Sequence, residues 1–359
     1  MSRSVSAEKL DPNLAVPDAD AKLLFYDIRQ LGLEGRGWEE TQSPFDRLPA
    51  KAEKIVPPAV WDLSHHSAGI FVRFVTDSTS ISARWKLRFP SLQMHHMPST
   101  GMSSLDLYVR GTDQWRWAGI GIAKEYPAAS AAILSGIKPG RRQFMLYLPL
   151  YNGVESVEIG IDKGAYLRKA PPQPDARPIV FYGTSIVQGG CASRPGMAHP
   201  AILGRWLARP AINLGFSGNG KMEVELAELL GEIDASAYVL DCLPNMNAEL
   251  LKERFKPFMM KLRSLKPRTP IVLVENVTYQ NAHLCADKMK RVVQSNKMLR
   301  REFKSLPASV AKKIRLVAGD TLYGNDWEAT MDGAHASDLG FLRIAEALAP
   351  VLRPLLRAR

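Results

Sequence analysis

The stretch PIVFYGTSIVQGG, residues 178–190, decides how the second half of the chain folds. Its first five residues form a run of apolar and aromatic side chains, typical of a strand that is buried on both faces. Gly183 permits a tight turn after this strand, and Ser185 follows at once. A serine in this place can present its hydroxyl at the edge of a sheet, although serine there also serves as the N-cap of a following helix.

Strand and helix patterns alternate from this stretch to the C-terminus. We predict further strands at 211–214, 237–240, 270–274 and 314–317, and helices at 198–207, 222–230, 250–265, 286–303 and 339–352. Five strands that alternate with helices predict an α/β fold with a parallel sheet in a three-layer α/β/α arrangement. Such sheets bind ligands beyond the carboxyl ends of their strands, so the loops at those ends are where chemistry is expected.

The first half of the chain has a different pattern. Short strands are predicted at 70–75, 81–87, 105–109, 144–148 and 157–161, without helical periodicity between them, which favours a β-sandwich or jelly roll. Four prolines then fall within residues 169–178 and indicate a stiff linker. We therefore expect an N-terminal extension at 1–20, a β-sandwich domain at 21–168, the linker at 169–178 and an α/β domain at 179–359.

Polar groups of several kinds follow the predicted strands of the α/β half. Ser185 follows the first strand, the glycine-rich loop around Gly218 follows the second, and Asn245 follows the third. Asp332 and His335, before the last helix, are close enough for the carboxylate to orient the imidazole. Each feature alone is weak, because asparagine commonly forms turns and serine commonly caps helices. Together they supply the hydroxyl, N–H groups, amide, imidazole and carboxylate of an acyl-transfer site.

Four sequence blocks resemble those of the SGNH (GDSL-like) hydrolases, in the same order. They are GTSI at 183–186, NLGFSG at 213–218, PN at 244–245 and DGAH at 332–335. The segment 179–352 is especially similar to a bacterial subgroup of GDSL-like lipase/acylhydrolases. The first half resembles the GxDLY β-sandwich domain that precedes them, with SLDLY at 104–108 as the matching stretch.

Three positions depart from the family pattern without removing a reacting group. Thr184 stands where the family usually has aspartate, and Ser104 replaces the glycine of the GxDLY motif. Leu243 replaces a glycine two residues before the asparagine, which affects the shape of that loop.

The resemblance implies a serine esterase that needs no metal and no organic cofactor. It implies that Ser185 is the nucleophile, His335 the base and Asp332 the residue that orients it. The N–H groups of Ser185 and Gly218 and the side chain of Asn245 are then expected to form the oxyanion hole. It also favours short acyl groups, such as acetyl on a carbohydrate. Two alternatives remain open: an acyltransferase with the same triad, and a non-catalytic carbohydrate-binding protein.

Composition bears on partners and location. The 359 residues carry a net charge of +11, but the basic residues are scattered and no nucleic-acid-binding motif is present, so we expect no nucleic-acid partner. There is no apolar run of the ~18 residues that a membrane span requires, and no visible signal peptide. We therefore expect a cytoplasmic protein that acts on a small-molecule or carbohydrate ester, with a processed secreted protein as the alternative. The oligomeric state stays open.

Several other side chains have two interpretations. Cys191, Cys242 and Cys285 are odd in number and lack metal-ligand spacing, which favours buried thiols. For His95 and His96 we favour structural roles. The alternative is that they belong to a loop that reaches over the active site. Trp115 and Trp117 favour the core over a sugar-binding platform. His199 could pair with Asp241 as a rival catalytic pair, but the pattern at 332–335 is favoured.

Overall fold

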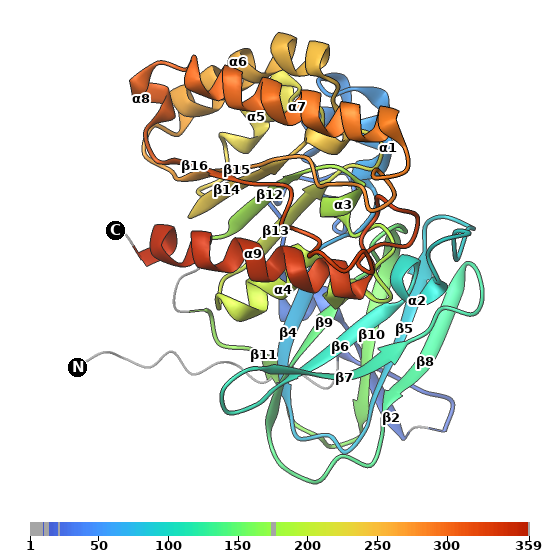
Figure 1. The fold of residues 1–359 in the computed structure, drawn as a ribbon. Coiled ribbons are helices and arrows are strands. Elements are labelled where there is room, and N and C mark those ends of the chain that lie inside the picture. The colour runs from blue at the N-terminus through green and yellow to red at the C-terminus, as the bar shows by residue number, and fades with distance from the viewer. Residues whose placement is uncertain (1–9, 11–13, 21, 174–176, 358–359) are drawn as a thin grey trace.

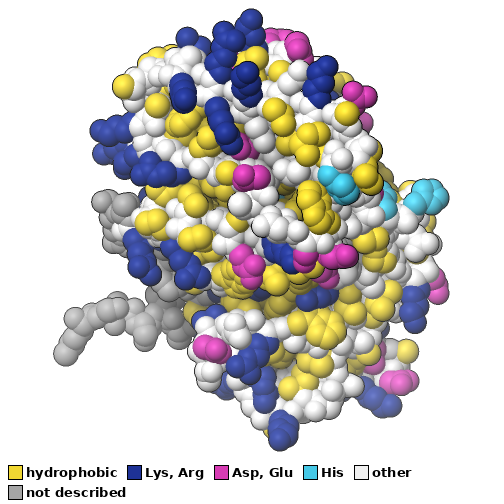
Figure 2. All heavy atoms as spheres, viewed as in Figure 1, with side chains coloured by type: hydrophobic (Ala, Val, Ile, Leu, Met, Phe, Trp, Pro, Cys, Tyr) yellow, Lys and Arg dark blue, Asp and Glu magenta, His cyan; other side chains and the backbone are white. Residues whose placement is uncertain are grey.

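The computed structural model describes the chain except for residues 1–9, 11–13, 21, 174–176 and 358–359. Antiparallel sheets form the first half and a parallel sheet flanked by helices forms the second, as predicted (Figure 1). No helix in the described part of the chain has the length and apolar character needed to cross a membrane. Lys and Arg side chains are spread over both halves on the face drawn in Figure 2.

The first half is a sandwich of two antiparallel sheets. One sheet has the order β1 (Val16–Pro17), β2 (Leu23–Asp27), β10 (Val154–Asp162), β5 (Ile81–Leu87), β8 (Ala128–Leu134). The other has the order β11 (Leu167–Lys169), β4 (Phe71–Thr76), β9 (Arg142–Tyr147), β6 (Leu105–Arg110), β7 (Trp115–Gly121), and β3 (Leu33–Glu34) pairs with β4. Alternating residues of these strands, such as Trp85 and Phe144, share one apolar core between the sheets.

The second half is built on a five-stranded parallel sheet. Its order is β13 (Ala211–Gly215), β12 (Ile179–Gly183), β14 (Ala237–Asp241), β15 (Ile271–Val274), β16 (Ile314–Val317). Helices α5 (Val224–Leu230), α6 (Ala248–Leu265) and α7 (Ala286–Lys304) lie on one face, and α4 (His199–Trp206) and α9 (Asp338–Arg357) on the other (Figure 1). Short helices α3 (Ser185–Gln188) and α8 (Ala308–Ala311) and the 3₁₀ turns η4 (Pro195–Met197) and η5 (Leu243–Asn245) complete it. Strands β12, β13, β14 and β15 are buried along their whole length, as their continuous apolar runs predict, and only the edge strand β16 has exposed residues.

One segment of the first half does not belong to the sandwich. Between β3 and β4 the chain forms η3 (Ala50–Lys54) and α1 (Pro58–Ser64), and these pack beside the parallel sheet (Figure 1). Leu48 and Val60 share an apolar cluster with Leu214 of β13. This segment lies within the range expected for the sandwich domain, 21–168, but outside its two sheets. Because the segment is short and irregular, it has no periodicity from which its position could be predicted.

The stretch that resembles the GxDLY motif joins the two halves. The Asp106 carboxylate is buried and accepts hydrogen bonds from the Arg194 guanidinium at 3.0 Å, the Gly196 N–H at 2.8 Å and the Trp117 indole at 3.0 Å. The hydroxyl of Tyr108 also contacts Arg194. The Trp117 side chain is 52% exposed, so its assignment to the core is wrong. Its indole N–H instead helps to saturate the buried carboxylate.

Candidate active site

Ser185 follows strand β12 and is the first residue of α3. Thr184 is the N-cap, and its side chain accepts from the Ile186 N–H at 3.3 Å. The capping role is thus taken by Thr184, which leaves the hydroxyl of Ser185 available for other contacts. The Ser185 carbonyl is held by the N–H groups of Gly189 and Gly190, at 3.0 and 2.8 Å. Ser185 is therefore fixed on a rigid turn at the carboxyl edge of the sheet.

Three sequence-predicted residues form a hydrogen-bonded chain here. Ser185 Oγ lies 2.8 Å from Nε2 of His335. Nδ1 of the same ring lies 2.7 Å from Oδ2 of Asp332. The other carboxylate oxygen of Asp332 accepts the main-chain N–H groups of Ala334 and His335, at 2.9 and 2.7 Å. The D-x-x-H stretch is thus a compact turn. The Asp332 carboxylate orients the His335 ring, and the main-chain N–H of His335 holds that carboxylate in place.

The charge on Asp332 sets the tautomer of the imidazole. Partial burial raises the pKa of Asp332, but hydrogen bonds from the main chain and ring of His335 outweigh that effect and hold the pKa at about 2. The carboxylate is therefore ionised at neutral pH and accepts the proton on Nδ1 of His335. The lone pair on Nε2 then faces the Ser185 hydroxyl, which is the arrangement a general base needs.

The two other predicted residues follow the strands on either side of β12. Gly218, after β13, has φ +68°, and a side chain added there would meet no atom within 4 Å. Glycine is therefore required by the backbone conformation and not by crowding. Asn245 ends η5 after β14, and its amide donates to the Asn219 carbonyl at 2.7 Å. Leu243, the departure from the family pattern, is fully buried in the core below this loop.

A glutamine that the sequence analysis did not single out connects α3 to the Gly218 loop. Gln188 Oε1 accepts from the Ser217 N–H at 3.0 Å, and Nε2 contacts Nδ1 of His66 at 2.9 Å and the Leu150 carbonyl at 3.0 Å. Burial, aided by the nearby charge of Arg47, lowers the pKa of His66 to about 3. His66 is therefore neutral, and its Nδ1 accepts from the glutamine amide. This fixes which end of the Gln188 amide faces Ser217.

A buried arginine supports the same region from the first half of the chain. Arg47 is 2% exposed and donates to the carbonyls of Asn213 and Gly215, at 3.1 and 2.6 Å, where β13 ends. It also donates to the carbonyls of Leu63 and His66. Burial lowers the pKa of Arg47 to about 9, so it remains charged at neutral pH. No local sequence signal identifies this role, since the partners of Arg47 at the end of β13 lie more than 160 residues away.

Two further side chains approach the imidazole of His335. A tight loop closed by hydrogen bonds between Met94 and Met97 carries His96, whose ring centroid lies 5.7 Å from that of His335. Of the two interpretations of this loop, the structure therefore supports the one in which it reaches the site. Cys191 is buried, with its thiol within 4.8 Å of a ring nitrogen of His335, and burial together with the charge of Asp332 raises its pKa to about 12.

The rival pair does not form. Among the described residues, neither ring nitrogen of His199 has a hydrogen-bond partner, and its ring packs against Phe181 and Phe341. Burial lowers the pKa of His199 to about 3 and raises that of Asp241 to about 7. His199 is therefore a neutral core residue.

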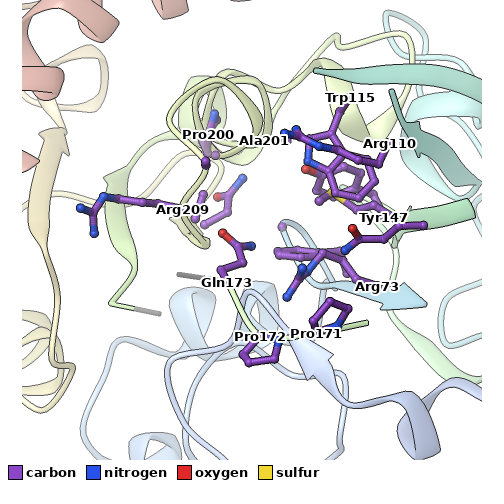
Figure 3. A pocket seen from close by; sticks show the side chains of 18 residues that line it. Arg73, Arg110, Trp115, Tyr147, Pro171, Pro172, Gln173, Pro200, Ala201 and Arg209 are labelled. Atoms are coloured by element: carbon purple, nitrogen blue, oxygen red, sulfur yellow. The ribbon is translucent and has the colours of Figure 1, made fainter. Parts of the chain in front are cut away.

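A cavity of about 240 Å³ between the two halves is distinct from this site (Figure 3). Its wall includes Trp115, Arg110, Tyr147 and Gln173, together with Ala211 at the amino end of β13. Because the candidate triad lies beyond the carboxyl ends of the strands, the cavity lies toward the opposite end of the sheet. Trp115 therefore lines a cavity that includes none of Ser185, Asp332 and His335.

Comparison with known proteins gives consistent matches over both halves. The sequence profile of the GDSL-like lipase/acylhydrolase family matches residues 176–353, and that of the N-terminus of SGNH-hydrolase-type esterases matches residues 23–167. A structure from Bacteroides ovatus, described as a GDSL-like lipase, is 34% identical with a TM-score of 0.89, and the match covers 93% of this chain and 98% of that one. No protein of curated function matches the chain.

Two more distant structures share the fold. A salicylyl-acyltransferase from a tetracycline biosynthetic pathway is 19% identical with a TM-score of 0.72, and the match covers 99% of each chain. A family two carbohydrate esterase from Clostridium thermocellum, in complex with cellohexaose, is 17% identical with a TM-score of 0.51, over 80% of this chain and 95% of that one.

Proposed function

Because the chain belongs to the GDSL-like lipase/acylhydrolase (SGNH) family, we propose that it is a serine esterase that cleaves a carboxylic ester through an acyl-enzyme. The observation that carries this proposal is the continuous hydrogen-bonded chain from Ser185 through His335 to Asp332. The three groups have the spacing and order that nucleophilic catalysis needs.

The reaction begins with attack of Ser185 Oγ on the acyl carbon. His335 Nε2 accepts the hydroxyl proton, and the imidazolium so formed is stabilised by the ionised Asp332. The tetrahedral intermediate collapses, the C–O bond to the alcohol breaks, and His335 returns the proton to the leaving oxygen. Water, deprotonated by the same imidazole, then releases the acid from the acyl-enzyme.

The negative oxygen of the tetrahedral intermediate needs fixed donors. In this proposal they are the N–H groups of Ser185 and Gly218 and the side-chain amide of Asn245. Each follows one of three adjacent parallel strands, and in this proposal the donors meet beyond the shared edge at which those strands end. One amide hydrogen of Asn245 is used by the Asn219 carbonyl, which holds the second in a fixed direction.

The substrate class is proposed as a short acyl ester of a carbohydrate, such as an acetyl ester. It is supported by the shared fold of a carbohydrate esterase with cellohexaose bound. It is also supported by the environment of Ser185, which is a turn enclosed by His335, Tyr151 and neighbouring polar groups. No long apolar channel is needed for an acetyl group.

Both halves of the chain act as one unit in this proposal. The domains at 21–168 and 179–359, joined by the linker at 169–178, share apolar clusters on both sides of the parallel sheet. The first half also brings His96 to the catalytic imidazole.

An acyltransferase that uses the same triad is the second candidate. It is favoured by the fold that this chain shares, over 99% of its length, with a salicylyl-acyltransferase. The two reactions differ only in whether water or an acceptor alcohol attacks the acyl-enzyme. The intact hydrogen-bonded triad argues against the remaining alternative, a non-catalytic carbohydrate-binding protein, because binding alone does not require it.

A panel of p-nitrophenyl esters and acetylated sugars tests the proposal. We expect turnover to be highest with acetyl and to fall as the acyl chain grows. When acceptor sugars are added, we expect most acyl groups still to be released as the free acid. Transfer of most acyl groups to the acceptor would favour the acyltransferase, and absence of turnover on every ester would exclude the esterase.

A further inference from the structure

Three side chains that ligate metals lie together at the catalytic imidazole. One ligand atom each of His96, Cys191 and His335 lie within 4.8 Å of one another. They come from a loop of the sandwich, from the turn after α3 and from the D-x-x-H stretch. We propose that these three residues form a binding site for a zinc ion, and that the bound ion inhibits the enzyme reversibly.

The chemical nature of the ligands selects the metal. Two imidazole nitrogens and one sulfur are the ligand types of zinc, and hard cations such as Mg²⁺ and Ca²⁺ require oxygen ligands instead. At the usual Zn–N and Zn–S distances, tetrahedral ligands lie about 3.3–3.8 Å apart. The three atoms thus need to approach by roughly 1 Å, which side-chain rotation of the half-buried His96 can supply. Water or the Ser185 hydroxyl would complete the coordination.

The ring of His335 is already oriented as a metal ligand. Its Nδ1–H is held by Asp332 at 2.7 Å, which leaves the lone pair on Nε2, 2.8 Å from Ser185 Oγ, as the one that a metal ion would have to bind. A carboxylate that binds the far nitrogen of a ligating histidine fixes the ring in the same way and strengthens the metal bond. The pair that activates a serine is therefore also suited to hold zinc.

Cys191 is held in place by the backbone. It follows Gly190 in a tight turn with φ +74°, a conformation that favours glycine, and its thiol is buried against the site. On zinc binding the S–H proton leaves to solvent and a Zn–S bond forms, with no change of oxidation state. Neither Cys242 nor Cys285 belongs to this cluster.

Inhibition follows from competition for one lone pair. Nε2 of His335 accepts the Ser185 proton in the proposed reaction, and the same lone pair would be donated to zinc. A zinc-bound enzyme therefore lacks its base until the ion leaves. This consequence rests on the proposed esterase function, but binding of the ion does not.

Binding is tested on the Ser185→Ala protein, so that the result does not depend on activity. Co²⁺ serves as a spectroscopic substitute for zinc, because a Co²⁺–thiolate bond adds a charge-transfer absorption band. We expect this band in Ser185→Ala and in Ser185→Ala/Cys285→Ser, but not in Ser185→Ala/Cys191→Gly. Glycine suits the positive φ at 191, so the last variant should fold. A band that persists without Cys191, or no band in any protein, overturns the site.

Inhibition is tested on the full-length active protein as the ratio of turnover with and without ZnCl₂. We expect Cys191→Gly and His96→Phe to raise the inhibitory zinc concentration by at least about 10-fold, since even partners of metal ligands contribute 10–100-fold to affinity. Cys285→Ser should match the unsubstituted protein. Equal inhibition of all four proteins overturns the proposal. If no ester is hydrolysed but the Cys191-dependent band is present, the zinc site stands and the esterase function fails.

Discussion

The side-chain amide of Asn245 donates a hydrogen bond to the main-chain carbonyl of Asn219 over 2.7 Å. This bond joins the loop after β14 to the loop after β13, the two loops that carry proposed oxyanion donors. It also explains how Asn245 keeps its orientation although the family's glycine is replaced by Leu243. The buried leucine anchors the loop from below while Asn219 fixes the amide from the side.

Substitution of Asn245 tests the oxyanion hole. We expect Asn245→Ala to lower kcat by about 10²–10³-fold with little change in KM, because the bond to the oxyanion forms in the transition state. Asn247→Ala is the matched control, since this nearby amide caps α6 through the Leu250 N–H and should affect stability without affecting kcat. A rise in KM at constant kcat would instead make Asn245 a residue that binds the ground state.

Gln188 is expected to position the Gly218 loop without touching the substrate. Gln188→Ala removes the acceptor for the Ser217 N–H and frees the loop that carries Gly218. A displacement of about 1 Å at a catalytic group costs up to ~100-fold, so we expect kcat to fall by roughly 10–100-fold at nearly constant KM. Thermal unfolding measured alongside separates this effect from loss of fold. An unchanged kcat would show that the loop keeps its position without Gln188.

The first half of the chain is expected to be required for folding of the second. Leu48 and Val60 pack on one face of the parallel sheet, and Met102 and Leu150 belong to the apolar cluster on the other. A protein that begins at Arg177 would expose both clusters to water, so we expect it to be insoluble or inactive on p-nitrophenyl acetate. A soluble truncated protein with full kcat would show that the sandwich is a detachable module.

The sequence predicts the sheet and the Asp332–His335 pair because both are local patterns, whereas Ser185, 150 residues from His335, is joined to them through the resemblance of the sequence blocks. Apolar runs mark the five parallel strands, and Asp332 and His335 are neighbours in one turn. The contributions of Arg47, His66 and Gln188 could not be predicted in this way, because each depends on contacts between segments far apart in the chain. His96 was a candidate, but only the fold shows that its loop reaches His335.

For Trp117 the sequence pattern predicts the wrong environment. Alternation with Trp115 along a strand favours the core, yet the side chain is largely exposed and its indole N–H binds the buried Asp106. Periodicity reports which residues share a face of a strand, but it does not report which face is covered.

Burial of His199 predicts a specific dependence of stability on pH. Its pKa is lowered from 6.5 to about 3 in the folded state, so between these values the unfolded chain binds a proton that the folded chain does not. Falling pH therefore favours unfolding, and the stability that neutral His199 preserves above pH 6.5 is lost progressively toward pH 3. One such group contributes a slope of at most about 1.4 kcal/mol per pH unit.

His199→Leu should remove this slope. We expect the free energy of unfolding from urea titrations to fall less steeply between pH 6.5 and 4.5 in the variant. The pH dependence due to His66, whose pKa is also lowered to about 3, should remain. Identical slopes for both proteins would mean that His199 gains a proton in the folded state.

Reaction with a serine-directed phosphonate ester tests the central claim most directly, because the reagent labels only a serine that a neighbouring base has activated. After treatment, intact mass and peptide mapping should locate a single adduct on Ser185, and the Ser185→Ala protein should gain no mass. An unlabelled native protein, or an adduct on a different serine, would contradict the assignment of Ser185 as the nucleophile.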